Sequence, residues 1–276
     1  MERQTRGMLT VQGSRSLIDP DWVEKLAPLG LDNPDSWSTF CDGEVASASK
    51  STNSFKVTLL AREQVYFKRY VYFGRRLRSP FLPSKAVVEA WGLTQMAKAG
   101  CFTPEIVAIG ERRVSGSIRA AHLVTRAIAN TVNLAELAKQ LSGLREQNIQ
   151  EWNQRVKFIS AGLIPQLQTM HAAGIYHYDL KWRNLLVEQR VSGYRVHLID
   201  CPRARRHRWR RFRGQVVDLS ALSRLAITHL SEFQRLRFLK QYLGSEYDRV
   251  YARKLLRAVN AHLSRRPPRG WQPHGG

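Results

Sequence analysis

The segment Gly174–Val187, GIYHYDLKWRNLLV, restricts the choice of fold more than any other part of the chain. It lies between a helical pattern and an apolar strand pattern, and in it Asp179 is followed five positions later by Asn184. The next strand pattern, VHLID, ends in Asp200. A carboxylate that closes an apolar strand is costly to bury without a partner, and a cation is a suitable one. The sequence therefore predicts a loop that carries Asp179 and Asn184, followed by a hairpin that ends in Asp200, where the carboxylate needs a partner.

The hydrophobic pattern predicts a β-rich half followed by a helical half. Strand-like runs occur in GEVASAS, FKVTLL, QVYFKRY, PEIVAIGE and RAAHLVTRAI, and a helix of about 15 residues is expected between Ser84 as N-cap and Gly100. From Asn133 the pattern is helical, apart from a predicted hairpin formed by NLLVEQ and YRVHLID. We expect an α+β fold with two lobes: a small antiparallel N-lobe with one helix, and a mostly helical C-lobe.

These changes of pattern divide the chain into four predicted parts. Residues 1–35 are expected to form an N-terminal extension that packs loosely on the N-lobe. Residues 36–127 form the N-lobe, which is predicted to bind nucleotide, and residues 128–264 form the C-lobe, which is predicted to hold the catalytic and acceptor-binding groups. Residues 265–276 are rich in Pro and Gly, and we expect them to be a disordered tail.

The charge of the chain indicates an anionic partner. Its 276 residues include 44 Lys and Arg against 22 Asp and Glu, a formal net charge of +22. Nucleic acid, an anionic membrane or a phosphorylated ligand would suit such a charge. No apolar run approaches the roughly 18 residues that span a bilayer, and the first residues do not resemble a signal peptide. Three widely spaced cysteines favour buried thiols over a disulfide framework or a zinc site.

Lys68, in the strand pattern VYFKRY, is predicted to pair with Glu89. A single lysine in so basic a chain would ordinarily be a solvated charge. Glu89, however, shares a helix face with Leu93 and Met96, so its carboxylate points toward an apolar side and needs a cationic partner. A strand lysine followed about 20 residues later by an inward helix glutamate resembles the Lys–Glu pair of kinases.

The loop at Asp179 resembles the H-R-D-L-x-x-x-N loop of protein-kinase-like phosphotransferases. The resemblance implies that Asp179 accepts the proton of an attacking hydroxyl, and that Asn184 and Asp200 bind Mg²⁺. It also implies that Lys68 and Glu89 serve the α and β phosphates of ATP. An isolated His-x-Asp could equally contain an ordinary turn or cap residue, but Asn184 and Asp200 at the expected offsets favour a functional site.

Several motifs, in order, resemble the lipopolysaccharide core kinases, the Kdo and heptose kinase group with a protein-kinase-like fold. The motifs are VYFKRY, SKAVVEAWGLTQMAKAGCFTPEIVAIGERR, HYDLKWRN, LIDCPRA and VVDLSAL. The resemblance implies ATP- and Mg²⁺-dependent transfer of phosphate to a Kdo or heptose hydroxyl of the lipopolysaccharide inner core. It also implies a cytoplasmic protein, peripheral on the cytoplasmic face of a Gram-negative inner membrane. Its partners would be the inner core or lipid A glycolipid and the anionic membrane surface.

Three further residues near the proposed base have predicted roles. Lys181 would lie beside the transferred phosphoryl group and offset its charge, with a solvated lysine as the alternative. His177 is predicted to be structural. Asp218 is either an acid favoured at a helix start or the buried acid that braces the catalytic loop, and we favour the second role.

The motifs also depart from those of regulated protein kinases. No GxGxxG precedes Lys68, and the Asp-Phe-Gly triplet reads Asp200-Cys201-Pro202, which suggests a loop that does not flip. Tyr178 replaces the arginine that grips a phosphorylated activation loop in those enzymes, so control by loop phosphorylation is not expected. The weak phosphate loop leaves a non-enzymatic binding module as one alternative, against which the complete Asp and Asn set argues.

An arginine segment, residues 203–213, takes the place of an activation loop and contains seven arginines. A solvated basic loop is the simplest interpretation. Arginine forks suit phosphate and carboxylate groups, however, and aromatic residues can stack on sugar, so we favour acceptor and membrane binding over nucleic acid. An atypical protein kinase of the RIO or Bud32 type, associated with RNA or ribosomes, is the alternative function. The residues predicted to bind acceptor and membrane are Arg203, Arg205, Arg206, Arg208, Trp209 and Arg210.

Overall fold

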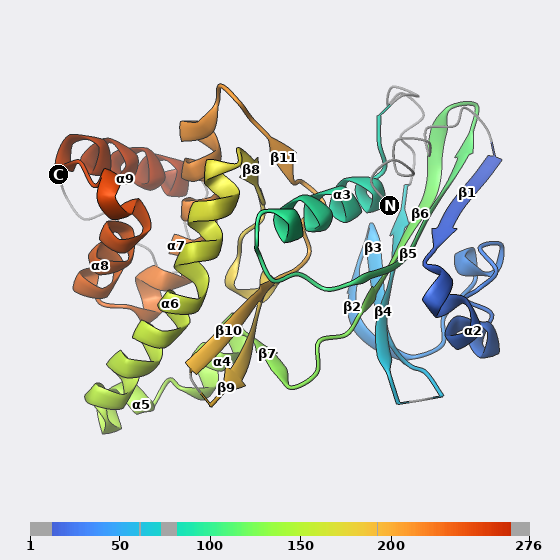
Figure 1. Ribbon diagram of the computed structural model, residues 1–276, viewed down its shortest axis with the longest axis horizontal. Coiled ribbons are helices and arrows are strands. Elements are labelled where there is room, and N and C mark those ends of the chain that lie inside the picture. Colours follow the sequence, from blue (N-terminus) through green and yellow to red (C-terminus); the bar gives the residue numbers. More distant parts are fainter. Residues whose placement is uncertain (1–12, 61, 73–81, 192, 266–276) are drawn as a thin grey trace. The chain divides into compact units, whose positions relative to one another are not determined.

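The computed structural model describes residues 13–60, 62–72, 82–191 and 193–265. The chain forms two compact units (Figure 1). The N-terminal unit contains residues 1–94 and 104–129, and the helical unit contains residues 95–103 and 130–276. The proposed disordered tail, apart from Arg265, lies outside the described residues.

The N-terminal unit is built on a six-stranded antiparallel sheet with the strand order β1-β5-β6-β4-β3-β2. Phe55 of β3 and Val65 and Phe67 of β4 lie on the same face of the sheet, because side chains two positions apart on a strand point the same way. All three are buried in one core. Ser84 Oγ accepts a hydrogen bond from Val87 N, 3.2 Å away, at the start of helix α3. The elements are β1 (Gly13–Ile18), β2 (Glu44–Ser49), β3 (Thr52–Thr58), β4 (Gln64–Val71), α3 (Lys85–Lys98), β5 (Ile106–Val114) and β6 (Ser117–Arg126).

The described part of residues 1–35 is an integral part of this unit. Strand β1 pairs antiparallel with β5 at the edge of the sheet. After it, Trp22, Leu26 and Leu31 are buried in the same core as Phe67. The loose packing expected from the sequence is therefore not observed. The short elements between β1 and β2 are η1 (Pro20–Trp22), α2 (Val23–Leu26), η2 (Ala27–Leu29) and η3 (Ser36–Ser38).

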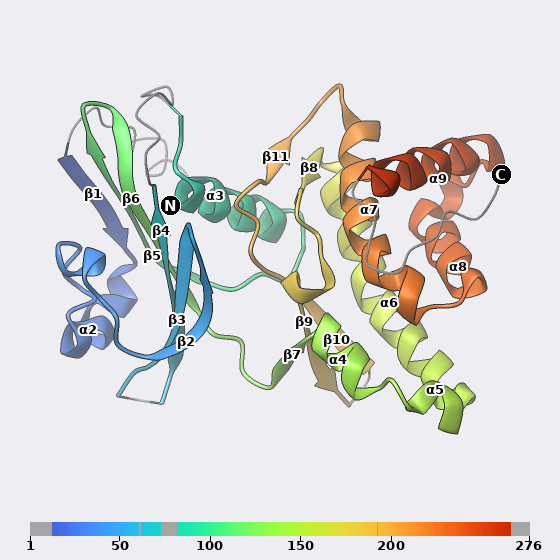
Figure 2. The same cartoon turned by 180° about the vertical axis from the view of Figure 1, so that it is seen from behind.

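The helical unit surrounds the long helix α6 (Ile149–Ala172), which packs against a small sheet and against other helices (Figures 1 and 2). The sheet has the order β10-β9-β7, and a second, two-stranded sheet pairs β11 with β8. Pro165 lies inside α6 without ending it. The strands are β7 (Thr131–Asn133), β8 (Ile175–Tyr176), β9 (Leu185–Arg190), β10 (Gly193–Leu198) and β11 (Arg205–Arg206). The remaining helices are α4 (Leu134–Gln140), α5 (Leu144–Gln147), η4 (Trp182–Asn184), α7 (Arg211–His229), α8 (Glu232–Leu243), η5 (Gly244–Glu246) and α9 (Arg249–Ser264).

A close contact between α6 and β10 fixes the hairpin that ends in Asp200. A Cβ atom at Gly162 would lie 2.5 Å from the carbonyl oxygen of Tyr194, so only glycine allows this approach. Beside it, the Gln166 amide donates to Val196 O at 2.8 Å and its carbonyl accepts from Phe102 N at 2.8 Å. These contacts hold the hairpin strand against α6.

Cys101 and Cys201 are buried, whereas Cys41 is exposed, so the prediction of buried thiols fails at one position. Within the described ranges, no helix combines the length and apolar character required to cross a membrane.

Candidate active site

In the N-terminal unit, Lys68 and Glu89 form an ion pair with 2.7 Å between Nζ and Oε1. Lys68 lies on β4 and Glu89 on α3, and their side chains are 17% and 2% exposed. The buried Tyr70, two residues after Lys68 on the same strand face, donates its hydroxyl to Oε2 of Glu89. Glu89 is thus held by a cation and by a hydroxyl, which satisfies both oxygens of its buried carboxylate.

In the helical unit, Asn184 joins the backbones of the two aspartates. Its amide nitrogen lies 2.8 Å from Asp179 O, 3.3 Å from Asp179 Oδ2 and 3.5 Å from Asp200 O. Its backbone carbonyl accepts from Ile199 N at 3.0 Å, which ties the loop to the end of the hairpin. The structure therefore brings Asp179, Asn184 and Asp200 together within this unit.

The loop that carries Asp179 rests on a buried acid. Asp218, on α7, is fully buried and accepts hydrogen bonds from His177 N at 2.9 Å and Tyr178 N at 2.7 Å. Nε2 of His171 lies 3.2 Å from the same carboxylate, and Nδ1 of His171 lies 2.7 Å from Tyr242 Oη. Burial raises the pKa of the Tyr242 hydroxyl, so that it remains protonated. These contacts match the bracing arrangement favoured for Asp218.

His177 is also fully buried, and its ring contacts backbone. Its Nε2 lies 3.0 Å from Ile199 O, and Asp179 N lies 3.3 Å from its Nδ1. Since both ring nitrogens face main-chain groups, His177 shapes the loop between the aspartates.

Two residues of the loop have left-handed backbone conformations that non-glycine residues rarely adopt. Tyr178 has a φ of 62° and Asp200 a φ of 58°. Such conformations cost free energy and persist where the surroundings enforce them. Here the Tyr178 backbone is held by Asp218 and the end of β10 by Asn184, so the strain is confined to the residues beside the proposed base and the proposed metal ligand.

Lys181 lies next to Asp179. Its Nζ is 2.6 Å from Oδ1 of Asp179, and the two side chains are 40% and 17% exposed. The lysine is therefore paired and in contact with solvent at the same time. A paired ammonium group at this position can neutralise negative charge that forms near Asp179.

The oxygen ligands offered by this loop suit Mg²⁺. Asp200 would offer a carboxylate and Asn184 an amide oxygen, because the amide nitrogen of Asn184 is used within the loop. Across the described ranges, no group of three or more His, Cys, Asp or Glu side chains is arranged to hold a metal. Mg²⁺ commonly binds through one or two protein oxygens together with phosphate oxygens. The residues present therefore fit a Mg²⁺ ion whose remaining ligands are phosphate oxygens of a nucleotide.

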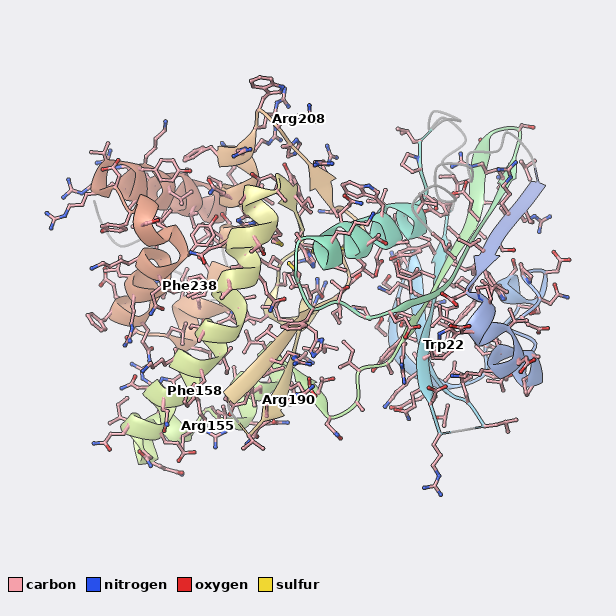
Figure 3. The ribbon with its side chains drawn as sticks, viewed as in Figure 1. Trp22, Arg155, Phe158, Arg190, Arg208 and Phe238 are labelled. Atoms are coloured by element: carbon pink, nitrogen blue, oxygen red, sulfur yellow. The ribbon has the colours of Figure 1, made fainter. Side chains whose placement is uncertain are left out.

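The arginine segment is only partly a loop. Arg205 and Arg206 form β11, and helix α7 begins at Arg211. Trp209 is 95% exposed, and its chain neighbour Arg208 lies between β11 and α7 (Figure 3). Within the part of the chain that the structure describes, none of the seven arginines forms an ion pair with an acidic side chain. The first turn of α7 also contains no acid.

Three contacts of the site were missing from the sequence predictions. Tyr70 was visible as a residue on the same strand face as Lys68, but nothing identified its hydroxyl as a partner of Glu89. His171 and His207, which contact Asp218 and Tyr178, lie 47 and 29 positions from their partners. No local pattern connects residues so far apart.

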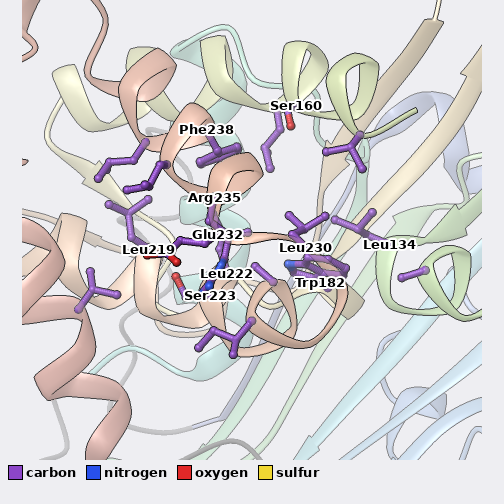
Figure 4. Close-up of a pocket in the computed structure, with 18 of the residues that line it drawn as sticks. Leu134, Ser160, Trp182, Leu219, Leu222, Ser223, Leu230, Glu232, Arg235 and Phe238 are labelled. Atoms are coloured by element: carbon purple, nitrogen blue, oxygen red, sulfur yellow. The ribbon is translucent and has the colours of Figure 1, made fainter. Parts of the chain in front are cut away.

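The helical unit also contains a cavity of about 420 Å³ that includes none of the predicted site residues (Figure 4). Leucine and other apolar side chains of α4, α6, α7, α8 and α9 form most of its wall. The lining also includes polar residues, among them Arg155, Ser223 and Glu232. In the described part of the chain, two buried polar atoms of the lining have no hydrogen-bond partner: the indole nitrogen of Trp152 and Nε of Arg235.

The chain is similar to known proteins in sequence and in fold. Residues 52–242, more than half of the chain, match the lipopolysaccharide kinase (Kdo/WaaP) family. A search of curated proteins found no match. The solved structure of WaaP in complex with acyl carrier protein is similar, with a TM-score of 0.68 and 20% identity over 94% of this chain and 100% of that chain. The Rio2 kinase from Chaetomium thermophilum, solved as an ADP/Mg²⁺-phosphoaspartate complex, has a TM-score of 0.48 and 14% identity over 87% of this chain and 77% of that chain.

The WaaP match confirms the predicted α+β architecture as a protein-kinase-like fold. The family match covers the strand with Lys68, the helix with Glu89, the loop with Asp179 and Asn184, and the strand end at Asp200. The chain therefore belongs to the Kdo/WaaP family of lipopolysaccharide kinases, and it is an ATP-dependent phosphotransferase that acts on a sugar hydroxyl of the lipopolysaccharide core.

Proposed function

We propose that Asp179 is the general base of a kinase that phosphorylates a Kdo or heptose hydroxyl of the inner core. The carboxylate of Asp179 accepts the proton of the sugar hydroxyl as the hydroxyl oxygen bonds to the γ-phosphorus of ATP, and the bond from that phosphorus to the β–γ bridging oxygen breaks to release ADP. The observation that carries this assignment is the junction at Asn184, which links Asp179 and Asp200 at 2.8 and 3.5 Å. If Asp179 were only an ordinary turn residue, contacts that link it through Asn184 to Asp200 would not be needed.

The other site residues receive roles from their contacts. Lys68, fixed by its 2.7 Å contact with Glu89, binds the α and β phosphates. Lys181, paired with Asp179, moves its ammonium group toward the γ-phosphate as negative charge develops there. Asn184 and Asp200 would hold Mg²⁺, which would neutralise phosphate charge when bound. His177 and Asp218 keep the loop in its strained conformation. With these roles, residues 36–127 bind the nucleotide, and residues 128–264 carry the base and the acceptor site.

Phosphate transfer in vitro tests the proposal. Purified protein with Mg-ATP is expected to phosphorylate deacylated core oligosaccharide, and an excess of EDTA is expected to abolish transfer. Absence of a phosphorylated product with core oligosaccharides that contain Kdo and heptose would contradict the acceptor. Activity that persists in EDTA would contradict the metal site. The family match does not favour the alternative, an RNA- or ribosome-associated protein kinase.

We also propose that the arginine segment binds the anionic acceptor and the cytoplasmic face of the inner membrane. Trp209 is the most exposed aromatic side chain among the described residues and lies between Arg208 and Arg210. Tryptophan prefers the membrane interface, and each basic residue near an anionic surface contributes about 1 kcal/mol. Helix α9 adjoins this segment, because the rings of Phe212 and Tyr251 lie 6.0 Å apart. The exposed Arg249, Arg253 and Arg257 of α9 extend the basic surface.

Vesicle sedimentation tests the membrane contact. We expect the protein to sediment with vesicles containing phosphatidylglycerol and not with pure phosphatidylcholine vesicles, because the attraction depends on anionic lipid. The double variant R208E/R210E is expected to lose most of this binding, about 2 kcal/mol or more. The matched control R145E/K157E changes the net charge by the same amount, at exposed positions of α5 and α6. Equal loss of binding in both variants would assign the effect to net charge and contradict the proposal.

A third proposal concerns the apolar cavity. WaaP was solved with acyl carrier protein, and we propose that this chain also binds an acyl carrier protein, with the acyl chain in the cavity. The volume of about 420 Å³ is within the usual range for ligand pockets. The unpartnered Trp152 and Arg235 groups could donate to the carbonyl end of the chain. Each buried methylene would contribute about 0.8 kcal/mol.

Thermal unfolding with loaded and unloaded carrier protein tests the cavity. Acyl carrier protein with a 12- to 16-carbon chain is expected to raise the Tm of this protein, because the ligand binds only the folded state. The same carrier without an acyl chain is the control and is expected to have little effect. Equal stabilisation by both forms would place the contact on the carrier surface and contradict binding in the cavity.

A further inference from the structure

The arginine segment is attached directly to the loop that carries Asp179. Strand β11 pairs with β8, with Arg205 opposite Tyr176. His207, the residue that follows β11, donates its backbone N–H to Gly174 O at 2.8 Å. Gly174 has a φ of 71°, and a Cβ there would lie 2.7 Å from His207 O. The segment can lie this close to the start of the loop because residue 174 is a glycine.

A side-chain hydrogen bond adds to this attachment. The hydroxyl of Tyr178 lies 2.7 Å from Nε2 of His207, with ring centroids 5.6 Å apart. The guanidinium of Arg205 lies over the Tyr178 ring at 5.7 Å. The backbone of Tyr178 is fixed by Asp218, and the next residue is Asp179. The side chain immediately before the proposed base therefore contacts the arginine segment at two points.

The positive charges around this contact favour the binding of an anion. The arginines of the segment form no ion pair among the described residues, and α7 begins without an acid in its first turn. Burial, together with the positive charges of Arg205, Arg210 and Arg213, lowers the pKa of His207 below its ordinary value. A neutral His207 can share the hydroxyl hydrogen bond of Tyr178 without adding to the positive charge.

We propose that Tyr178 and His207 are positioning residues for the acceptor. Their hydrogen bond holds the arginine segment in a fixed place relative to the catalytic loop. An acidic group of the acceptor, phosphate or carboxylate, binds the arginines, and the fixed spacing then places the acceptor hydroxyl at Asp179. This inference rests on the proposed function, because it assumes Asp179 as base and an anionic sugar as acceptor. It assigns neither residue a contact with ATP.

Steady-state kinetics of single and double variants test the inference. Tyr178→Phe keeps the ring and removes the hydroxyl, and His207→Ala removes the other partner. Each change is expected to raise the KM for deacylated core oligosaccharide about fivefold, the factor expected for one hydrogen bond, and to lower kcat because the hydroxyl is held less firmly at Asp179. The KM for Mg-ATP is expected to stay within about twofold. The double variant is expected to show no more than the single effect, because both changes remove the same bond. Tyr194→Phe is the control, because the hydroxyl of Tyr194, on β10, accepts a hydrogen bond from Arg155 of α6 at 2.9 Å and, among the described residues, does not contact the arginine segment.

The outcomes separate the inference from the proposed function. An acceptor KM unchanged in both single variants would overturn the inference while leaving the kinase intact, as would equal changes in the KM for ATP. Multiplying effects in the double variant would also overturn it, because two independent contacts would then be involved. If the wild-type protein transfers no phosphate to the oligosaccharide, the proposed function fails and the inference fails with it.

Discussion

Replacement of Asp179 by asparagine is expected to lower kcat for phosphate transfer by about 10³-fold. Asparagine has nearly the same shape, so Asn184 can keep its 2.8 Å contact with the backbone oxygen of residue 179. It cannot accept a proton, however, and the 2.6 Å ion pair with Lys181 is lost. Kinetics with saturating Mg-ATP and core oligosaccharide measure the change. The Tm and the affinity for Mg-ATP are expected to stay near the wild-type values.

The Asp248→Asn variant is the matched control for this experiment. Asp248 is the exposed N-cap of α9, and its side chain accepts from Val250 N and Tyr251 N. Asparagine is an equally good N-cap, so activity and stability should not change. A D179N protein that retains more than about a tenth of the wild-type kcat would contradict the role of Asp179 as base.

Replacement of Asp218 by alanine is expected to have the largest effect on stability. The backbone N–H groups of His177 and Tyr178 would lose their acceptor in a fully buried region, and His171 would lose its partner. Each unsatisfied buried group costs about 1 to 3 kcal/mol, so we expect a loss of about 4 kcal/mol and a fall in Tm of roughly 10 °C. Thermal denaturation followed by circular dichroism measures this change.

The same substitution should also affect activity in the fraction that remains folded. Without Asp218, the Tyr178 backbone N–H loses the hydrogen bond that helps hold it at a φ of 62°, and the loop is expected to relax away from the strained conformation. Asp248→Ala, which removes a helix cap from α9, should cost only about 1 kcal/mol and leave kcat unchanged. If D218A were as stable and as active as D248A, Asp218 would not brace the catalytic loop.

The site could be predicted from the sequence because its chemistry is local. Asp179 and Asn184 lie on one short loop, and the position of that loop is limited by the helix before it, which ends at Ala172, and by the hairpin after it. The Lys68–Glu89 pair could be predicted for a related reason. The helix period places Glu89 on an apolar face, where a carboxylate needs a cation, and few lysines precede that helix on a strand.

The contacts that the sequence could not predict are long-range or lack a hydrophobic pattern. Strand β1, GSRSLI, alternates mostly polar residues, so no period of two distinguishes it from a loop, and its partner β5 begins 88 residues after the end of β1. Strand β11 has two residues, both arginine, and a basic run normally indicates a solvated loop. The Tyr178–His207 hydrogen bond depends on that unpredicted strand, because β11 places His207 beside the catalytic loop.

Mass spectrometry of core oligosaccharide tests the central claim most directly, because it reports the acceptor and the number of phosphates together. Oligosaccharide would be prepared from cells that contain the wild-type protein, from cells that lack it, and from cells that carry the D179N variant. The account predicts that oligosaccharide from the last two strains lacks one phosphate on a Kdo or heptose residue that the wild-type material carries. The same phosphate content in all three preparations would contradict it.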